Sequence, residues 1–176
     1  MYKRQAQVRN IAGFSRFLEI AASENGQCVN YSKLGRAAGV NDVSIKEYYE
    51  ILHDTLLAYY IPSWSNSKRE QLQSSPKYYL FDNGVINALL GELRSLPNPS
   101  TYRYGRLYEN FVLGQLVQYK SKNDCSGKIY HYRDKSGKEV DFIIQKNPHS
   151  TPIALEVKSS TKVSLVDIKH LSLIHI

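Results

Sequence analysis

The first third of the chain carries apolar residues at the spacing of amphipathic helices. Apolar positions recur every three or four residues in three stretches that begin near Ile11, Asn30 and Ser44, which predicts three helices. Asn30 is the expected cap of the second helix and Gly39 its end, and Ser44 opens the third helix in a Ser-x-x-Glu capping box. The faces expected to be buried are Ile11, Phe14, Leu18 and Ala22 in the first helix and Ile45, Tyr49, Leu52 and Leu56 in the third.

Two strand-like runs follow these helices. LLAYYIPSW at residues 56–64 and KYYLFD at residues 77–82 are rich in tyrosine and aliphatic residues, and a polar, proline-bounded stretch separates them. Three helices followed by a hairpin is the element order of a winged helix. An unrelated small α+β unit has the same order, so both interpretations stay open.

The exposed positions of the third helix do not favour contact with DNA. These positions are expected to be Lys46, Glu47, Glu50, His53 and Asp54. Their net charge is negative, whereas a recognition helix must approach phosphates and base edges. We therefore expect this helix to dock a protein or to act as a spacer.

A fourth helix and a linker close the first part of the chain. Asn83 is expected to cap this helix, and its apolar face consists of Ile86, Leu89, Leu90 and Leu93. The sequence PNPS at residues 97–100 has the composition of a linker. The sequence predicts a winged-helix domain with a connecting helix at residues 8–96 and a second domain at residues 101–176.

The second domain is predicted to be an α/β unit whose sheet has mostly consecutive strands. An amphipathic helix comes first, with an apolar face of Leu107, Phe111, Val112 and Leu116. Three strands joined by polar turns follow in the segments KIYHYRD, EVDFIIQ and PIALEVKSS. The segment SLVDIKHL at residues 164–171 has a helical pattern and is expected to close the domain.

Charged residues inside two of these strands predict a cation site. Side chains alternate between the faces of a strand, so Glu156 and Lys158 share one face. If the two strands pair through the short loop between them, Asp141 meets Glu156 across the sheet. Neighbouring carboxylates repel unless a positive charge lies between them, and Mg²⁺ or Mn²⁺ supplies that charge with oxygen ligands.

Two further side chains extend this site. Lys158 can position an attacking water or stabilise charge on a phosphorus atom. Glu109, at the edge of its helix's apolar face, can orient a metal-bound water; the alternative is an ion pair with Arg106. For the whole group, the alternative is a structural ion-pair cluster without catalytic activity.

The segments EVDF and ALEVKSS resemble the signature of PD-(D/E)xK nucleases, an acid on one strand and Glu-x-Lys on the next, preceded by a helix with a Glu. The matching positions are Asp141, Glu156, Lys158 and Glu109. Val140 stands where the proline of the signature would be. The resemblance implies a restriction-endonuclease-like α/β fold, metal ligands from Asp141, Glu156 and the Val157 carbonyl, and hydrolysis of DNA.

The order of four motifs resembles a more specific family. YYLFDNGVINALLG, GRLYENFVLGQL, YRDKSGKEVDFII and IALEVKSS follow one another as in the C-terminal half of a prokaryotic family of AAA-type ATP-binding proteins. In that family an ATPase module precedes a winged helix and a nuclease-like domain. The resemblance covers about residues 10–171. It implies a gene fragment that lacks its ATPase module, a C-terminally truncated nuclease-like domain, and foreign terminal sequences MYKRQ and SLIHI.

The charge distribution favours DNA as a partner. The chain has a net charge of +7, and residues 101–176 hold twelve Lys and Arg against seven Asp and Glu. Arg133, Lys135 and Lys162 are expected to contact phosphates. The alternative is a solvated basic edge.

Other features narrow the class of protein. Cys28 and Cys125 are far apart and no Cys/His cluster occurs, which argues against a zinc site and a disulfide framework. No phosphate-loop motif is present, so we expect no nucleotide on this chain. No apolar stretch approaches the roughly 20 residues of a membrane span and no signal-peptide pattern opens the chain, so the expected location is the cytoplasm.

Two functions are therefore compatible with the sequence. The first is a Mg²⁺-dependent phosphodiesterase acting on DNA, with Asp141, Glu156, Lys158 and Glu109 in its active site. The second is a catalytically inactive region of an ATPase that binds DNA or a partner protein, in which the charged cluster supports folding.

Overall fold

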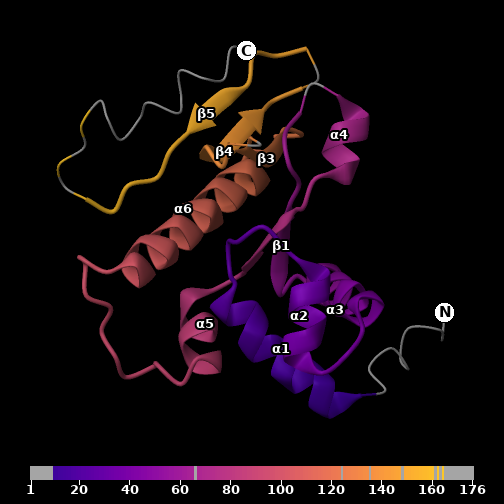
Figure 1. Ribbon diagram of the computed structural model, residues 1–176. Coiled ribbons are helices and arrows are strands. Elements are labelled where there is room, and N and C mark those ends of the chain that lie inside the picture. Colours follow the sequence, from indigo (N-terminus) through magenta and orange to yellow (C-terminus); the bar gives the residue numbers. More distant parts are fainter. Residues whose placement is uncertain are drawn as a thin grey trace. The chain divides into compact units, whose positions relative to one another are not determined.

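The computed structural model describes residues 10–65, 67–123, 125–134, 136–147 and 149–160, together with Lys162 and Ser164. Over these residues the protein is an α+β structure with six helices and two small sheets (Figure 1). Lys135, both terminal sequences and residues 165–171 of the predicted closing helix lie outside the described residues. No helix in the described part combines the length and apolar composition needed to cross a bilayer.

The chain folds into two compact units that are not continuous in sequence. The first unit contains Tyr78–Ser95 and the chain up to Tyr60. The second contains Ile61–Lys77 and the chain from Leu96 onward. The predicted hairpin therefore contributes its central segment to the second unit. The assignment of residues 8–96 to one domain stays a prediction.

The first unit holds four helices and the smaller sheet. The helices are α1 (Ile11–Ser23), α2 (Tyr31–Ala38), α3 (Asp42–Asp54) and α5 (Asn83–Leu89). Strand β1 (Ala58–Ile61) pairs with β2 (Lys77–Leu80), and α4 (Lys68–Gln73) lies between these strands in sequence, within the second unit. The predicted order of three helices and two strands is confirmed, and α4 is an addition that the polar pattern of its segment did not predict.

Side-chain oxygens fix the first residues of the helices. Asn30 caps α2 by accepting a hydrogen bond from the Lys33 N–H at 2.9 Å, as predicted. The predicted cap of α3 is wrong, because the Asn41 side chain accepts from the Ser44 N–H at 2.7 Å. Asn caps helices as well as Ser does, so the Asn that comes first in the chain starts α3 three residues earlier.

The start of α5 needs a similar correction. Asp82, rather than Asn83, is the cap, and its carboxylate accepts from the Val85 N–H at 3.0 Å. A carboxylate also interacts favourably with the positive end of the helix dipole. Helix α5 ends at Leu89, so Leu93 lies beyond it and is exposed.

The core of the first unit is aromatic at its centre. Phe17 is fully buried, and its ring meets Tyr49 edge-on with centroids 4.9 Å apart; Tyr49 in turn stacks on Tyr78 at 4.2 Å. Two residues predicted to be buried are exposed instead, Ile11 at 76% and Leu56 at 77%. Both lie at or past helix ends, where the helical period no longer decides which side faces the core.

The cap of α3 gives a test of this local structure. Asn41→Ala should lower the free energy of unfolding by about 1 kcal/mol, because the Ser44 N–H loses its acceptor. Ser44→Ala is the matched control, since Ser44 contributes its backbone to this cap. Urea unfolding followed by circular dichroism measures both. A larger loss for Ser44→Ala would contradict the assignment.

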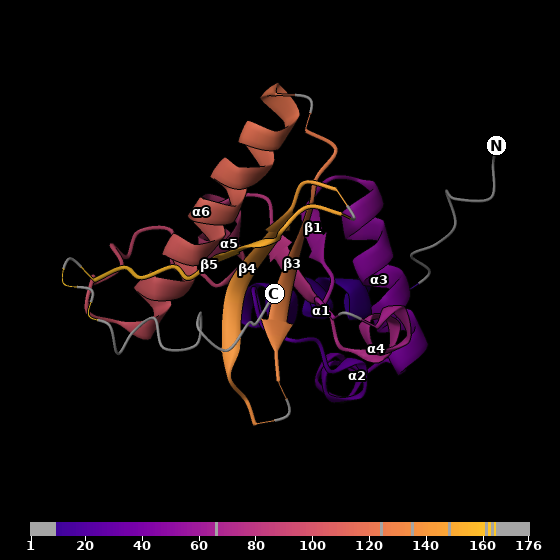
Figure 2. The ribbon, with the colours of Figure 1, turned by 90° about the horizontal axis from the view of Figure 1, so that it is seen from above.

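The second unit combines one long helix with a three-stranded sheet. Helix α6 (Tyr102–Lys122) precedes β3 (Lys128–Arg133), β4 (Glu139–Gln145) and β5 (Ile153–Leu155). The sheet has the order β3-β4-β5 with antiparallel neighbours, which confirms the predicted meander, and α6 lies beside it in both views (Figures 1 and 2). Its core includes Leu107, Leu113, Val140, Phe142 and Ile143.

Helix α6 is rotated from its predicted orientation. Leu107 is buried as expected, but Phe111 is 53% exposed, and Asn110 and Leu113 lie in the interior instead. These three interior positions are spaced three residues apart, so they form one stripe on the helix. The rotation leaves Glu109 at the edge of the buried stripe.

The segment Ile61–Lys77 is held to β3 through His131. Ser63 forms a parallel bridge with His131, whose backbone bonds to Pro62 and Trp64. The ring of His131 is fully buried, and its Nε2 lies 3.1 Å from the Ser75 carbonyl oxygen. Residues before and after α4 thus attach at a single position of the sheet.

His131 makes the stability of the protein dependent on pH. Burial lowers its pKa from 6.5 to about 4, and Lys77 and Arg133 contribute in the same direction while the Ser75 carbonyl and Glu139 oppose them. The unfolded chain therefore binds a proton below pH 6.5 that the folded chain binds only near pH 4. The free energy of unfolding should fall by up to about 3 kcal/mol as pH decreases across this window.

The comparison of His131→Gln with the wild type isolates this contribution. Gln retains an N–H for the Ser75 carbonyl but does not titrate, so the variant should lose less stability between pH 6.5 and pH 4. His149→Gln, at an exposed histidine, is the control. Equal pH profiles for His131→Gln and the wild type, measured by urea unfolding, would refute the assignment.

Candidate functional site

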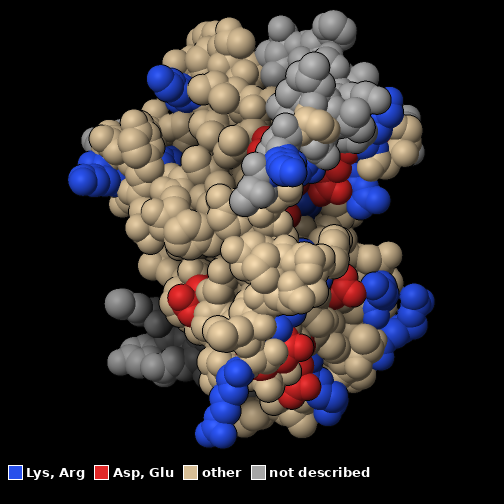
Figure 3. Space-filling view, turned by 90° about the vertical axis from the view of Figure 1, so that its left-hand side faces the viewer, with Lys and Arg blue, Asp and Glu red and all other residues tan. Residues whose placement is uncertain are grey.

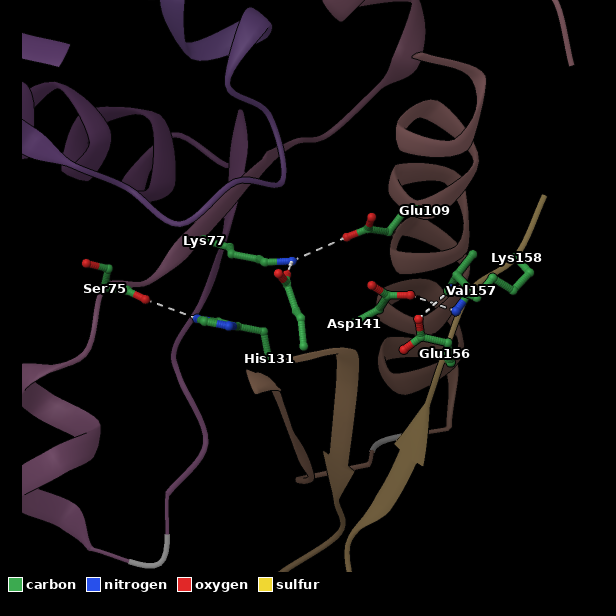
Figure 4. A network of polar contacts seen from close by, with 9 residues as sticks. Ser75, Lys77, Glu109, His131, Asp141, Glu156, Val157 and Lys158 are labelled. Atoms are coloured by element: carbon green, nitrogen blue, oxygen red, sulfur yellow. Dashed lines mark hydrogen bonds and ion pairs between the residues drawn. The ribbon is translucent and has the colours of Figure 1, made fainter. Parts of the chain in front are cut away.

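The pairing of β4 with β5 brings Asp141 and Glu156 together. Phe142 lies opposite Leu155 in an antiparallel register, so the next positions outward are Asp141 and Glu156. Strand β5 ends at Leu155, and the Asp141 carboxylate takes over the pairing by accepting a hydrogen bond from the Val157 N–H at 2.7 Å. The two carboxylates lie side by side at the end of the sheet (Figure 4).

Glu156 has one satisfied and one unsatisfied oxygen. Its Oε1 lies 2.7 Å from the Lys158 Nζ, and the Glu156 side chain is 9% exposed. Its Oε2 is buried without a hydrogen-bond partner in the structure. A buried carboxylate oxygen without a partner is costly, and a cation is the group that would stabilise it.

Asp141 lies in an environment that disfavours its ionised form. Its pKa is raised from 3.8 to about 7, chiefly by burial and then by the negative charges of Glu109 and Glu156. The hydrogen bond from Val157 and the charge of Lys77 act in the opposite direction. A raised carboxyl pKa beside like charges is a common property of functional sites.

Lys77 joins this acidic group from a distant part of the sequence. Its Nζ lies 3.6 Å from Glu109 Oε1 and forms a closer ion pair with Glu139, and its side chain is 3% exposed (Figure 4). Burial by itself lowers the pKa of Lys77, but Glu109 and Glu139, with a smaller effect from Asp141, raise it above the usual value. The sequence reasoning missed Lys77, since a lysine at the start of a strand resembles an ordinary exposed terminus.

A pocket opens beside Asp141 and Glu109 within the second unit, and Glu156 is not among the residues that line it. It has a volume of about 700 Å³, and among the residues that line it are Arg106, Glu109, Asp141, Val157 and Lys158. Ser159 and Ser160 also line it. Acidic and basic side chains therefore face one space, to which a ligand from solvent has access.

Of the three residues predicted to contact phosphates, the structure describes Arg133 and Lys162. Arg133 is exposed at the end of β3, in register with Glu139, and Lys162 is exposed beyond β5. Neither belongs to the described lining of the pocket, and Lys135 is not described. On the face drawn in Figure 3, Lys and Arg are spread over separate places with acidic residues between them. Their role with DNA stays a prediction.

The acidic residues do not by themselves complete a metal site. Within the described residues, no three His, Cys, Asp or Glu side chains are arranged to hold an ion. Mg²⁺, however, is commonly bound by one or two carboxylates together with waters and substrate oxygens. The pair of Asp141 and Glu156 meets that smaller requirement, with Glu109 held by Lys77 nearby.

Two family models match this chain, one in each half. A family model with the description "Domain of unknown function (DUF8612)" matches residues 2–95, just over half of the chain. The chain belongs to this family. A second model, "Domain of unknown function (DUF4143)", matches residues 104–175 of this DUF8612 member, which include all the residues of the pocket from Gly105 onward.

Longer proteins of bacteria contain a similar region. Uncharacterized proteins of Mycobacterium bovis and Mycobacterium tuberculosis are each 25% identical to this DUF8612 member over 154 residues, which cover 88% of this chain and 34% of the relative. An uncharacterized protein of Haemophilus influenzae is 25% identical over 169 residues, covering 85% of this chain and 39% of its own. The chain thus spans about a third of the length of these relatives. No solved structure matches it.

Proposed function

We propose that this chain is the C-terminal region of an AAA-type ATP-binding protein, and that its second unit is a PD-(D/E)xK nuclease-like domain that binds a divalent cation and hydrolyses DNA phosphodiesters. The proposal rests on one observation. Asp141 and Glu156 are neighbours at the end of the β4–β5 pairing, and the Oε2 atom of Glu156 is buried without a hydrogen-bond partner. The first unit, with three helices followed by two paired strands, is proposed to be a winged helix.

The donors present at the end of the sheet suit Mg²⁺ or Mn²⁺. Asp141 and Glu156 would supply carboxylate oxygens, and the Val157 carbonyl would supply a third oxygen from the same turn of chain. All are hard oxygen donors, and the pocket leaves room for waters and a phosphate to complete the coordination. A cation at this place would give the Glu156 Oε2 atom a partner and would offset the negative charges that raise the pKa of Asp141.

The surrounding side chains suit phosphodiester hydrolysis. In this reaction the oxygen of water bonds to phosphorus, one P–O ester bond breaks, and the leaving oxygen gains a proton. A bound divalent cation supplies a more acidic water and neutralises charge on the phosphate. Lys158, 35% exposed at its side chain and held by Glu156, would donate hydrogen bonds to a phosphate oxygen at the pocket.

The distribution of charge supports a nucleic acid substrate for the second unit. Arg106 and Lys158 line the pocket with the carboxylates, and the second half of the chain has the larger surplus of basic residues. In the first unit, by contrast, the predicted solvent positions of α3 are all exposed and net acidic. We propose that DNA contacts the second unit and that α3 docks a protein surface, such as the ATPase module.

An inactive accessory region is the second candidate function. Lys77 already pairs with Glu109 and Glu139, and Lys158 with Glu156, so three of the acids in the cluster have protein cations beside them. Under this alternative the cluster stabilises the fold, and DNA or a partner protein binds elsewhere. Glu156→Ala would then lower stability and leave DNA affinity unchanged, and calorimetry would detect no divalent cation.

Cleavage of plasmid DNA tests the first function. The protein with Mg²⁺ or Mn²⁺ should nick supercoiled plasmid, and Asp141→Asn should reduce the rate at least about 100-fold, because one of two carboxylate ligands is lost. Lys158→Met should reduce the rate by about 10- to 100-fold. Agarose gels of the time course measure both effects.

The controls address folding and contamination. Asp54→Asn removes an exposed carboxylate from the first unit and should cleave at the wild-type rate. Asn at position 141 retains an acceptor for the Val157 N–H, so its fold should be preserved. Nicking that survives Asp141→Asn and Lys158→Met would show that the activity does not arise at this site.

A further inference from the structure

Lys77 is buried where an ammonium group is costly. It is 2% exposed, the one Lys or Arg that is buried within the described part of the chain. Its segment, Ile61–Lys77, is attached through Ser63 and Ser75 to β3, which lies at the opposite edge of the sheet from β5. A buried charge is kept in a fold when it is paired, and Lys77 is paired with two carboxylates rather than one.

The two partners of Lys77 come from different elements of the site. Glu109 lies on α6 and lines the pocket, whereas Glu139 lies on β4, two residues before Asp141. Neither Glu139 nor Glu156 is among the residues that line the pocket. Side chains two residues apart on a strand share a face, so Glu139 would otherwise stand beside Asp141. The Lys77 ammonium therefore pairs with both Glu side chains, and Figure 4 shows its contact with Glu109.

The acidic side chains of the group outnumber the basic ones. When ionised, Glu109, Glu139, Asp141 and Glu156 carry four negative charges, and Lys77, Lys158 and the pocket residue Arg106 carry three positive charges. The group therefore keeps an excess of one negative charge. Without Lys77 this excess would be larger, and Glu109 and Glu139 would lose the cation that they share.

We infer that Lys77 is a positioning residue of the metal site: it holds Glu109 and Glu139 by ion pairs, beside Asp141 and Glu156, the two carboxylates proposed to bind one divalent cation. This inference rests on the proposed function. Lys77 touches neither the cation nor the DNA. It acts through Glu109 and Glu139 by limiting the number of anionic ligands, and so keeps the affinity of the site for the cation moderate.

Calorimetric titration of the full chain with Mn²⁺ alone tests this inference. The wild type should bind one ion, and Asp141→Asn should abolish binding. Lys77→Met removes the internal cation and should bind Mn²⁺ about tenfold more tightly, because a positive charge near the ion is lost and two carboxylates are released. Lys128→Met, at an exposed lysine of β3, makes the same change in net charge and should bind as the wild type does.

A second variant covers the case in which Lys77→Met fails to fold. Lys77→Met combined with Glu139→Gln keeps the net charge of the group and leaves Glu109 as the released carboxylate. It should also bind Mn²⁺ more tightly than the wild type, and this difference cannot arise from net charge. Circular dichroism confirms that each variant is folded before titration.

The outcomes distinguish the role inferred for Lys77 from the proposed metal-dependent function on which it rests. One bound ion in the wild type together with unchanged affinity in both Lys77 variants would overturn the role of Lys77 and leave the proposed metal site intact. Failure of the folded wild type to bind Mn²⁺ would overturn the proposed function and the inference with it. A change in Lys128→Met equal to that in Lys77→Met would reduce the effect to net charge and also overturn the inference.

Discussion

The register between β4 and β5 is the constraint on which the candidate site depends. Backbone pairing sets Phe142 opposite Leu155, and this alignment alone places Asp141 next to Glu156 at the point where the strands part. A slip by one residue would turn every side chain of β5 to the other face. The hydrogen bond from the Val157 N–H to Asp141 continues the pairing by a side chain, so an ionisable group also ends the sheet.

Repulsion among carboxylates then determines which other groups the site requires. Asp141 lies near Glu109 and Glu156 in a buried environment, where like charges weaken one another's ionisation. Two lysines relieve part of this repulsion, from opposite ends of the second unit's sequence. Lys158 lies two residues after Glu156, while Lys77 is the first residue of β2. The Glu156 Oε2 atom is buried without a hydrogen-bond partner even though Lys158 contacts the other oxygen of this carboxylate.

The second unit is discontinuous in sequence, so a cut near residue 96 would separate its two parts. The first family model ends at residue 95 and the second begins at residue 104. The segment Ile61–Lys77 lies within the first model but belongs to the second compact unit. This segment supplies Ser63 beside β3, the Ser75 carbonyl for His131 and Lys77 for the acidic group. A fragment that begins after residue 96 would therefore expose the ring of His131 and leave Glu109 and Glu139 without Lys77.

The sequence by itself determined the features that depend on neighbouring residues: the helix opened by Asn30 and the three consecutive strands. Strand β5 ends at Leu155, so Glu156 and Lys158, which were predicted to share a strand face, lie beyond it. Alternation along a strand and a short loop were also sufficient to pair Asp141 with Glu156. The rotation of α6, the exposure of Ile11 and Leu56 and the position of Lys77 were decided by the tertiary structure. Periodicity describes one element at a time, whereas an ion pair between residues 77 and 139 depends on which elements the whole chain packs together.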